Sequence, residues 1–302
     1  MIVSSILDVI GNTPIVKLSH LSPLGKADVY AKAEFLNPMG SVKDRPALAM
    51  VNAAEKDNKL HHGMTIVEAT SGNTGVGLTM VSVIKNYKVI IIMEEIDIVE
   101  SICKIVKTLG AEVIRTNSFE SAVKLAETFQ QENPEKYYVP HQFKNIANPQ
   151  IHTETTAQEI IKDVGPRIKA FVSTFGSGGT FTGIGRALKK YNPNIELVLI
   201  EPDTVPIFSG GRITCSEIHG VGPTFVSDIF DRSLIDTIVQ VSAQQAREAS
   251  LNMARTEGIL CGPSAGASVY VAAKVAERYS SNDIVVTILP DRGERYFGEN
   301  VF

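Results

Sequence analysis

Short apolar runs alternate with amphipathic stretches along most of this sequence, and this alternation constrains the fold more than any other feature. The runs 64–69 (MTIVEA) and 88–93 (KVIIIM) are typical of buried strands, and 75–86 between them is a predicted helix. Four apolar residues of 99–110 fall on one helical face, and Gly110 suits the end of that helix. Strands and helices in this order form right-handed βαβ units, so the sequence predicts parallel sheets covered by helices.

The same alternation resumes after a loop-rich segment at 140–150, which predicts two doubly wound α/β lobes. The predicted strands are 64–69, 88–93, 111–116, 170–175, 195–202 and 283–290, and the predicted helices include 75–86, 99–110, 120–131, 182–191 and 243–258. Asn117 and Glu120 suit the start of the third helix. Ligands of such sheets bind beyond the carboxyl ends of the strands, so we expect the active site in the cleft between the lobes.

Composition narrows the class of protein. A chain of 302 residues exceeds the usual single core, which agrees with two lobes. The net charge is −4 and the basic residues are scattered, which argues against nucleic acid or an anionic membrane as the partner. The three cysteines are far apart, so we expect neither disulfides nor a metal site. No signal peptide or membrane-spanning run is visible, and we expect a soluble, cytoplasmic protein.

One glycine-rich turn, 70–75 (TSGNTG), stands directly between a predicted strand and a predicted helix. Gly72 and Gly75 permit a tight turn that leaves backbone N–H groups free to face an anion at the helix N-terminus. Hydroxyl and amide side chains add donors at the same place, namely those of Thr70, Ser71, Asn73 and Thr74. A polar turn is the commoner explanation of such a segment, but six consecutive small or polar residues favour a site for a carboxylate.

A second turn, 176–180 (GSGGT), also follows a strand and precedes a helix, and it resembles a cradle for a phosphate. It lacks the dinucleotide fingerprint, because Phe181 stands where the third glycine is needed, and no Walker A lysine follows. A small phosphorylated ligand therefore fits better than a nucleotide. By itself, a connecting turn would explain the segment equally well.

Two further features concern single side chains. The turn 262–266 (GPSAG) places Ser264 at the start of a helical run, where a capping role is the simplest explanation. Lys43 stands in a tight loop, 37–45 (NPMGSVKDR), just ahead of another helical run. Such a lysine is either a solvated charge or a nucleophile held in a pocket.

A lysine, a phosphate cradle and a carboxylate cup together suit pyridoxal 5′-phosphate acting on an amino acid. The motifs NPMGSVKDR, EATSGNTG, GSGGTFTGIGR, SGG (209–211) and PDRGERY also occur in this order. On these motifs the chain resembles the cysteine synthase (O-acetylserine sulfhydrylase) and cystathionine β-synthase family of fold-type II pyridoxal-phosphate enzymes. The resemblance extends from residue 10 to residue 297.

The resemblance implies roles for individual residues. Lys43 matches the Schiff-base lysine, Asn73 the residue that hydrogen-bonds the ring oxygen of the cofactor, and Ser264 the serine facing the pyridine nitrogen. The phosphate loop is matched by Gly176, Ser177, Gly178, Gly179 and Thr180. The site for the substrate carboxylate is matched by Thr70, Ser71, Gly72, Asn73, Thr74 and Gln142.

The resemblance also implies a fold like that of tryptophan synthase β. We expect a smaller, mobile lobe at 41–145, and a larger lobe made of 1–40 and 146–302. The implied chemistry is β-replacement on an activated serine through an α-aminoacrylate. O-acetylserine and sulfide giving cysteine is the favoured reaction, carried out by a homodimer that has a serine acetyltransferase as a partner.

The chain departs from the family pattern at 93–101 (MEEIDIVES), where relatives carry a segment like M-P-E-x-M-S-x-E-R. Asp97 stands at the methionine position and could help to select an amino-acid nucleophile, although a solvated acidic loop is an equal alternative. Arg212 could approach a phosphate leaving group. Phosphoserine or cysteine as the first substrate, a cystathionine- or diaminopropionate-type product, and a non-catalytic regulatory homologue therefore stay open.

Overall fold

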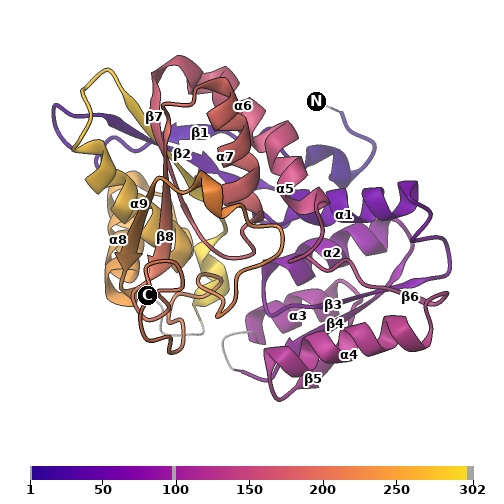
Figure 1. The fold of residues 1–302 in the computed structure, drawn as a ribbon. Coiled ribbons are helices and arrows are strands. Elements are labelled where there is room, and N and C mark those ends of the chain that lie inside the picture. The colour runs from indigo at the N-terminus through magenta and orange to yellow at the C-terminus, as the bar shows by residue number, and fades with distance from the viewer. Residues whose placement is uncertain (1, 97–99, 298–302) are drawn as a thin grey trace.

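Two separate β-sheets organise the chain in the computed structural model, which describes residues 2–96 and 100–297 (Figure 1). The strands are β1 (Ile15–Lys17), β2 (Asp28–Ala33), β3 (Thr65–Ala69), β4 (Lys88–Glu94), β5 (Glu112–Thr116), β6 (Tyr137–Tyr138), β7 (Ile168–Thr174), β8 (Glu196–Pro202), β9 (Thr237–Val241) and β10 (Ile284–Leu289). The α-helices are α1 (Asp44–Lys56), α2 (Asn73–Ile84), α3 (Glu100–Thr108), α4 (Phe119–Glu132), α5 (Ala147–Ile151), α6 (Ala157–Val164), α7 (Gly179–Tyr191), α8 (Ala243–Glu257) and α9 (Pro263–Ala276). A π-helical turn, His152–Thr156, joins α5 to α6.

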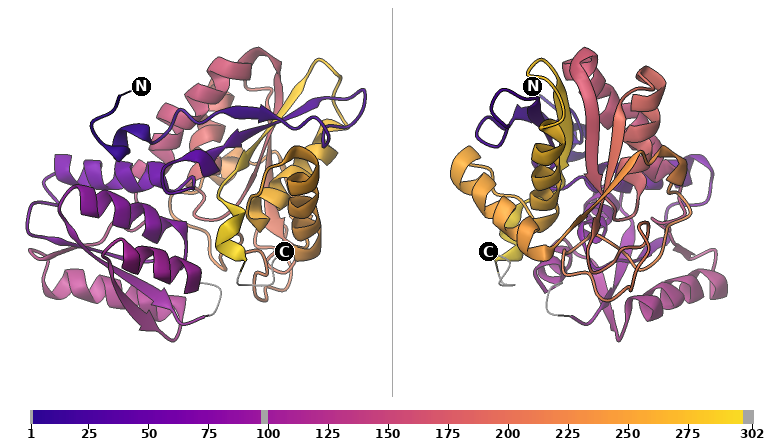
Figure 2. Two further views of the ribbon diagram at one scale, coloured as in Figure 1. Left: turned by 180° about the vertical axis from the view of Figure 1, so that it is seen from behind. Right: turned by 60° about the vertical axis from the view of Figure 1, so that its left-hand side comes forward.

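The larger sheet has the order β1-β2-β10-β7-β8-β9, and only β1 runs antiparallel to its neighbour. Helices α8 and α9 cover one face, while α6 and α7 cover the other (Figure 2). Alternate residues of each strand point to opposite faces, so Val172 packs in the core under α9 and Phe171 in the core under α7. Both faces are therefore buried, which explains why β10 is apolar almost throughout.

The smaller sheet is parallel and has the order β5-β4-β3-β6. One face packs against α1, α2 and α3, where Ile66 and Ile91 are fully buried. The other face packs against α4, whose Ala122 contributes to a separate core with Val67. The chain thus forms two three-layer α/β units side by side, as the alternation predicts (Figures 1 and 2).

The predicted strands and helices are all present in the described part of the chain, with their ends shifted by a few residues. One difference concerns α4, which begins at Phe119 because Ser118, rather than Asn117, caps it by accepting a hydrogen bond from the Ser121 backbone N–H. The pattern analysis did not predict β1, β2, β6 and β9. Two of these, β1 and β6, are three and two residues long, too short for a periodic signal.

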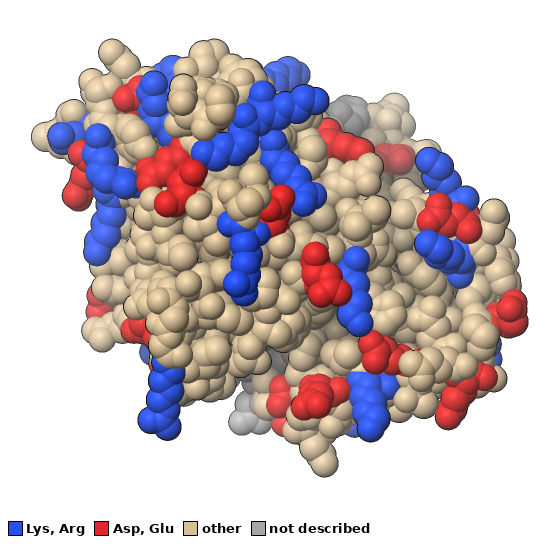
Figure 3. All heavy atoms as spheres, in the orientation of Figure 1, with Lys and Arg blue, Asp and Glu red and all other residues tan. Residues whose placement is uncertain are grey.

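The surface carries charges of both signs. On the face drawn in Figure 3, basic and acidic side chains are interspersed. No described helix is long and apolar enough to cross a membrane. All three cysteines are free thiols, and the described residues contain no group of three acidic, histidine or cysteine side chains that could hold a metal ion.

Candidate active site

A cavity of about 410 Å³ lies between the two α/β units, at the carboxyl ends of β3, β4, β7 and β10. This is where ligands bind to doubly wound sheets. The predicted site residues that line it are Lys43, Thr70, Ser71, Gly72, Asn73, Thr74, Gln142, Gly176, Ser177, Gly178, Thr180 and Ser264. Segments far apart in the sequence therefore meet around a single space.

The loop before α1 holds Lys43 at the edge of this cavity. Its conformation is fixed from two sides, because the backbone N–H of Val42 donates to Pro290 O at 2.7 Å and that of Arg292 donates to Gly40 O at 3.2 Å. Gly40 has φ +75°, and a Cβ there would lie 2.9 Å from the Arg292 side chain. Only glycine fits this position without strain. The tight loop thus attaches the lysine to the end of β10.

Lys43 is partly buried, and burial lowers the pKa of its amine from 10.5 to about 8, an effect that the nearby carboxylate of Asp291 partly opposes. At neutral to mildly alkaline pH a substantial fraction of this amine is therefore unprotonated. A neutral amine can attack an aldehyde carbon, whereas an ammonium group cannot. The position and electrostatics of Lys43 favour a nucleophile over a solvated charge.

The loop 70–74 between β3 and α2 forms the second wall. The hydroxyl of Thr74 donates to Gln142 Oε1 at 2.6 Å, which joins two of the predicted carboxylate-binding residues. Gln142 is positioned by Glu68, whose buried carboxyl accepts the backbone N–H groups of His141 at 2.9 Å and Gln142 at 3.3 Å. The buried Ser71 Oγ has no hydrogen-bond partner among the described residues. This wall thus presents an unused donor beside the free N–H groups at the start of α2.

The loop 176–180 leads from β7 into α7, and its glycines are required by their surroundings. Gly178 has φ +83°, a left-handed conformation that favours glycine. A Cβ on Gly179 would lie 2.1 Å from Asn148 Oδ1. Asn148 donates through Nδ2 to Gln142 O at 2.9 Å and to Ser177 Oγ at 3.2 Å, so it links the two loops. Gly179 itself does not line the cavity.

Sequence reasoning about single residues missed Asp291, which is buried and lines the cavity. Its Oδ2 accepts hydrogen bonds from Asn73 Nδ2 at 2.6 Å and from the Tyr296 hydroxyl at 2.5 Å. Its Oδ1 has no partner among the described residues. Asp291 is the second residue of the motif PDRGERY, so the family resemblance could have pointed to it. Ser264 borders the same space from the first turn of α9.

Aromatic side chains from both units line the outer part of the cavity. Phe143 contacts Phe119 and Phe225 edge to face, with ring centroids 6.0 and 5.0 Å apart. Glu94 and Ile96 line the cavity beside them, and the exposure of Ile96 and Phe225 marks this as the outer part of the cavity. Of the altered segment 93–101, the carboxylate of Glu94 therefore borders the site. Asp97 lies outside the described residues.

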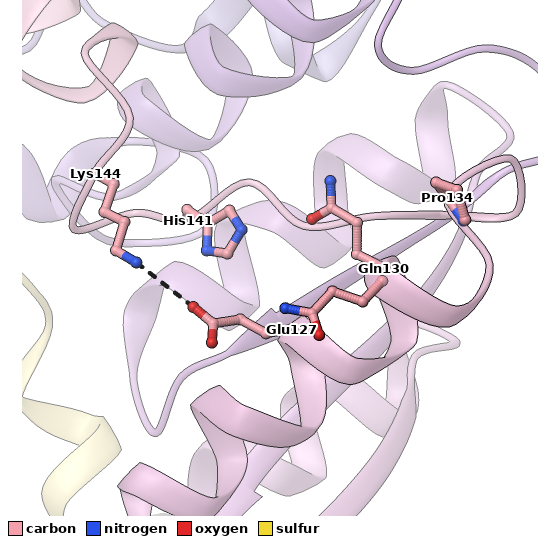
Figure 4. A pocket seen from close by; sticks show the side chains of 6 residues that line it. Glu127, Gln130, Pro134, His141 and Lys144 are labelled. Atoms are coloured by element: carbon pink, nitrogen blue, oxygen red, sulfur yellow. Dashed lines mark ion pairs between the residues drawn. The ribbon is translucent and has the colours of Figure 1, made fainter.

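Arg212 is exposed and does not line the cavity. A second, separate hollow on the smaller unit is lined by Glu127, Gln130, Gln131, Pro134, His141 and Lys144 (Figure 4). There Lys144 Nζ and Glu127 Oε1 form an ion pair at 3.5 Å. None of the predicted site residues that the structure describes lines that hollow.

The residues of the cavity fit pyridoxal 5′-phosphate. The amine of Lys43 suits the aldehyde, and the start of α7 offers N–H groups without intrahelical partners to a phosphate. Ser71 Oγ and Asp291 Oδ1 are buried polar atoms without partners among the described residues, and such atoms are rare unless a ligand or water pairs with them.

Comparisons with known proteins identify the relatives of this chain. The sequence profile of the family described as "Pyridoxal-phosphate dependent enzyme" matches residues 6–291. A cysteine synthase of Staphylococcus aureus is 41% identical over 304 residues, which cover 99% of this chain and 97% of the relative.

Solved structures are similar over the whole chain. One is an O-ureido-L-serine synthase with a TM-score of 0.95 and 37% identity, and the match covers 100% of this chain and 96% of that one. Another is an O-acetylserine-dependent cystathionine β-synthase from Helicobacter pylori, with a TM-score of 0.94, 34% identity and coverage of 100% and 99%. The chain thus has the expected fold-type II architecture, belongs to the family of pyridoxal-phosphate-dependent enzymes, and is one of its β-replacement enzymes.

Proposed function

We propose that this protein is a cysteine synthase, which replaces the acetate of O-acetylserine by sulfide. The observation that carries this proposal is the meeting of Lys43 with the loops 70–74 and 176–180 around a single cavity. The S. aureus relative bears the name cysteine synthase and matches nearly end to end, which supports the same reaction class.

The family resemblance implies the roles of the individual residues, and their positions around the cavity support these roles. Gly176 to Thr180 would hold the phosphate of the cofactor, Asn73 its ring oxygen and Ser264 its pyridine nitrogen. The loop 70–74 with Gln142 would bind the carboxylate of the amino acid. When bound, the cofactor supplies an electron sink for the negative charge that develops at the α-carbon.

Lys43 would serve twice in this reaction. Its Nζ would hold the aldehyde of the cofactor and, once displaced by the amino group of the substrate, would take the proton from the α-carbon. Burial already lowers the pKa of this amine to about 8, so little energy is needed to keep it unprotonated. Ser264, a hydroxyl rather than a carboxylate, would leave the pyridine nitrogen unprotonated, which favours loss of the β-substituent.

A second candidate function uses an amino-acid nucleophile in place of sulfide. The carboxylate of Glu94 on the outer part of the cavity favours it, because it could pair with the ammonium group of a second amino acid. Asp97 would assist there, and Arg212 would matter only if phosphoserine were the donor. Cysteine as donor and a purely regulatory role are further outcomes of the same experiment.

The experiment is a substrate matrix. The purified protein with cofactor is mixed separately with O-acetylserine, phosphoserine, serine and cysteine, and each donor is combined with sulfide, homocysteine or cysteine. Cysteine formed fastest from O-acetylserine and sulfide supports the proposal. Cystathionine formed faster from homocysteine would establish the second candidate, and no product from any pair would leave the regulatory role.

We also propose that the protein works as a homodimer in the cytoplasm and that a serine acetyltransferase is its partner. Apolar side chains exposed near the N-terminus, including Ile2 and Ile6, support a subunit contact. Three free thiols suit a reducing compartment. Light scattering gives the mass of the protein alone, and co-elution with a serine acetyltransferase tests the partner.

A further inference from the structure

Five side chains that titrate line the described cavity: Lys43, Glu94, His219, Asp291 and Tyr296. The proposed reaction assigns Lys43 to the α-carbon and uses Asp291 as an acceptor for Asn73 and Tyr296. Glu94 lies on the outer part. His219 remains, an imidazole that neither the sequence analysis nor the proposed function uses.

His219 stands opposite the proposed carboxylate loop. Its Nε2 lies 3.9 Å from the position that a Cβ on Gly72 would occupy, so the ring nitrogen points across this loop. The other side of the ring contacts Tyr296 edge to face, with centroids 5.8 Å apart. Neither ring nitrogen has a hydrogen-bond partner within residues 2–96 and 100–297. An imidazole held by packing alone keeps both nitrogens available to a ligand.

We propose that His219 is a general base that takes the proton of the thiol or sulfide nucleophile as it attacks the β-carbon. This role rests on the proposed β-replacement function and adds a residue to it. The carboxylate leaving group has already departed in the donor step with the electron pair of its bond to the β-carbon. In the following step the sulfur electron pair forms the new carbon–sulfur bond, the S–H proton moves to Nε2, and the electron pair displaced at the β-carbon passes to the α-carbon, which regains a proton from Lys43. The imidazolium then returns its proton to water.

The surroundings keep this imidazole in the right state. Burial lowers the pKa of His219, and the carboxylate of Asp291 opposes this shift only in part. Tyr296 faces the ring with its edge, and its hydroxyl is engaged with Asp291. The imidazole is thus neutral near pH 7 and ready to accept a proton.

If His219 has this role, its replacement should slow the second half-reaction by a factor that depends on the protonation of the nucleophile. The thiolate is the attacking form, so a base is needed only where the nucleophile arrives protonated. With sulfide at about pH 6, His219→Gln should slow the second half-reaction about 100-fold, within the range for general base catalysis. At about pH 9, where sulfide is ionised, the loss should be less than about threefold.

The test separates the two half-reactions by stopped flow. The donor is added first, the spectral change of the bound cofactor is timed, and the nucleophile follows. A nitro-substituted aromatic thiol, ionised throughout this pH range, serves as the second nucleophile and should be affected less than about threefold. Three results for His219→Gln would overturn the role. The second half-reaction could slow equally with both nucleophiles, it could slow equally at both pH values, or the donor step could slow.

Two measurements do not depend on turnover. Nuclear magnetic resonance follows the titration of each histidine, and the signal that is absent in His219→Gln belongs to His219. The pKa of this signal in the wild type should lie below the ordinary range for histidine. A pKa above that range would refute the role. The affinity for the cofactor should be unchanged. His62→Gln, at an exposed histidine, is the matched control, and His219→Asn replaces the first variant if that one does not fold.

The wild-type protein distinguishes this inference from the proposed function. If the wild type does not turn over O-acetylserine with sulfide, the proposed function fails. If it does, and His219→Gln shows no pH-specific loss with sulfide, only the role of His219 fails.

Discussion

The side-chain amide of Asn73 donates a 2.6 Å hydrogen bond to Asp291 Oδ2, which joins the start of α2 to the end of β10 across the cavity. The oxygen of the same amide, Asn73 Oδ1, accepts a hydrogen bond from Arg295. Both ends of the amide are therefore held, and its orientation is fixed before any ligand binds. Because α2 belongs to one α/β unit and β10 to the other, this bond also connects the two units across the site.

The first prediction concerns this bond. Asp291→Asn keeps the size of the side chain but removes the charge that strengthens the hydrogen bonds from Asn73 and Tyr296. The amide of Asn73 then loses its fixed orientation, and we expect the affinity for pyridoxal phosphate to fall about tenfold, the equivalent of a bond to a charged group. Fluorescence titration of the cofactor-free protein measures this. An unchanged affinity would show that Asp291 does not orient the site.

The second prediction concerns Lys43 in the cofactor-free protein. Its pKa in the folded protein is about 8, below the ordinary 10.5, because burial disfavours the ammonium form. A lowered pKa means that the folded state binds fewer protons, so this group contributes stability above pH 10.5 that is lost as the pH falls towards 8. The difference in free energy of unfolding between Lys43→Met and the parent should therefore change within this window and be constant below it.

Urea unfolding at a series of pH values gives this difference directly. If the difference in free energy of unfolding between Lys43→Met and the parent stays constant across the alkaline range, the pKa of Lys43 is not lowered by folding. The lowered pKa would then no longer support Lys43 as the nucleophile. Lys59→Met, at an exposed lysine, is the matched control for replacing a lysine by methionine.

Much of the architecture and of the site was predictable from the sequence, because the information is local. The loops 70–75 and 176–180 are short, and each follows a strand and opens a helix, so their backbone N–H groups had to face the carboxyl edge of a sheet. The residues missed were those whose roles depend on distant contacts. Asn148 and Asp291 reach partners far away in the chain, and no spacing rule connects them.

The strand β2 was missed for a related reason. Its sequence DVYAKA places Lys32 in the middle of the larger unit, and a charged residue there argues against a buried strand. The structure accommodates it because Lys32 Nζ pairs with Glu159 at 2.7 Å and also donates to the carbonyl oxygen of Thr13. The division into a smaller, mobile lobe at 41–145 and a larger lobe made of 1–40 and 146–302 remains a prediction.

The third prediction tests the same cluster of charges. Arg45, two residues after Lys43, pairs with Glu34 at 2.8 Å and with Glu159 at 2.7 Å, and Glu159 also holds Lys32. Glu159→Gln would leave Lys32 buried without a counter-charge, and we expect a loss of about 3 kcal/mol in the free energy of unfolding. The exposed pair of Asp57 and Lys59 gives the control, because Asp57→Asn should cost less than about 0.5 kcal/mol.

The same variant has a defined pH dependence. Hydrogen bonds and charges from Arg45 and Lys32 outweigh burial and lower the pKa of Glu159 from 4.5 to about 2. A lowered carboxyl pKa contributes stability above pH 4.5 that is lost as the pH falls to about 2. The gap between Glu159→Gln and the parent should therefore narrow across this window. If the difference in free energy of unfolding between Glu159→Gln and the parent is the same at all pH values, the destabilisation comes from altered packing and not from the lost charge.

The last prediction concerns Gly179, which does not touch the cavity but controls the loop that does. A Cβ at this position would lie 2.1 Å from Asn148 Oδ1, and Asn148 cannot retreat without breaking its bonds to Gln142 O and Ser177 Oγ. Gly179→Ala should therefore displace the start of α7 and the N–H groups that would hold a phosphate. We expect the affinity for pyridoxal phosphate to fall about 100-fold, the loss of two charge-assisted hydrogen bonds.

Gly185→Ala on the same helix is the matched control. Its Cβ would meet the end of the Leu197 side chain at 3.0 Å, far from the loop, so the substitution strains the core and leaves the start of α7 in place. It should lower the melting temperature with less than about a threefold effect on cofactor affinity. If both alanine variants lower the affinity for the cofactor equally, general destabilisation of α7 explains the effect. The contact between Gly179 and Asn148 then does not control the phosphate loop.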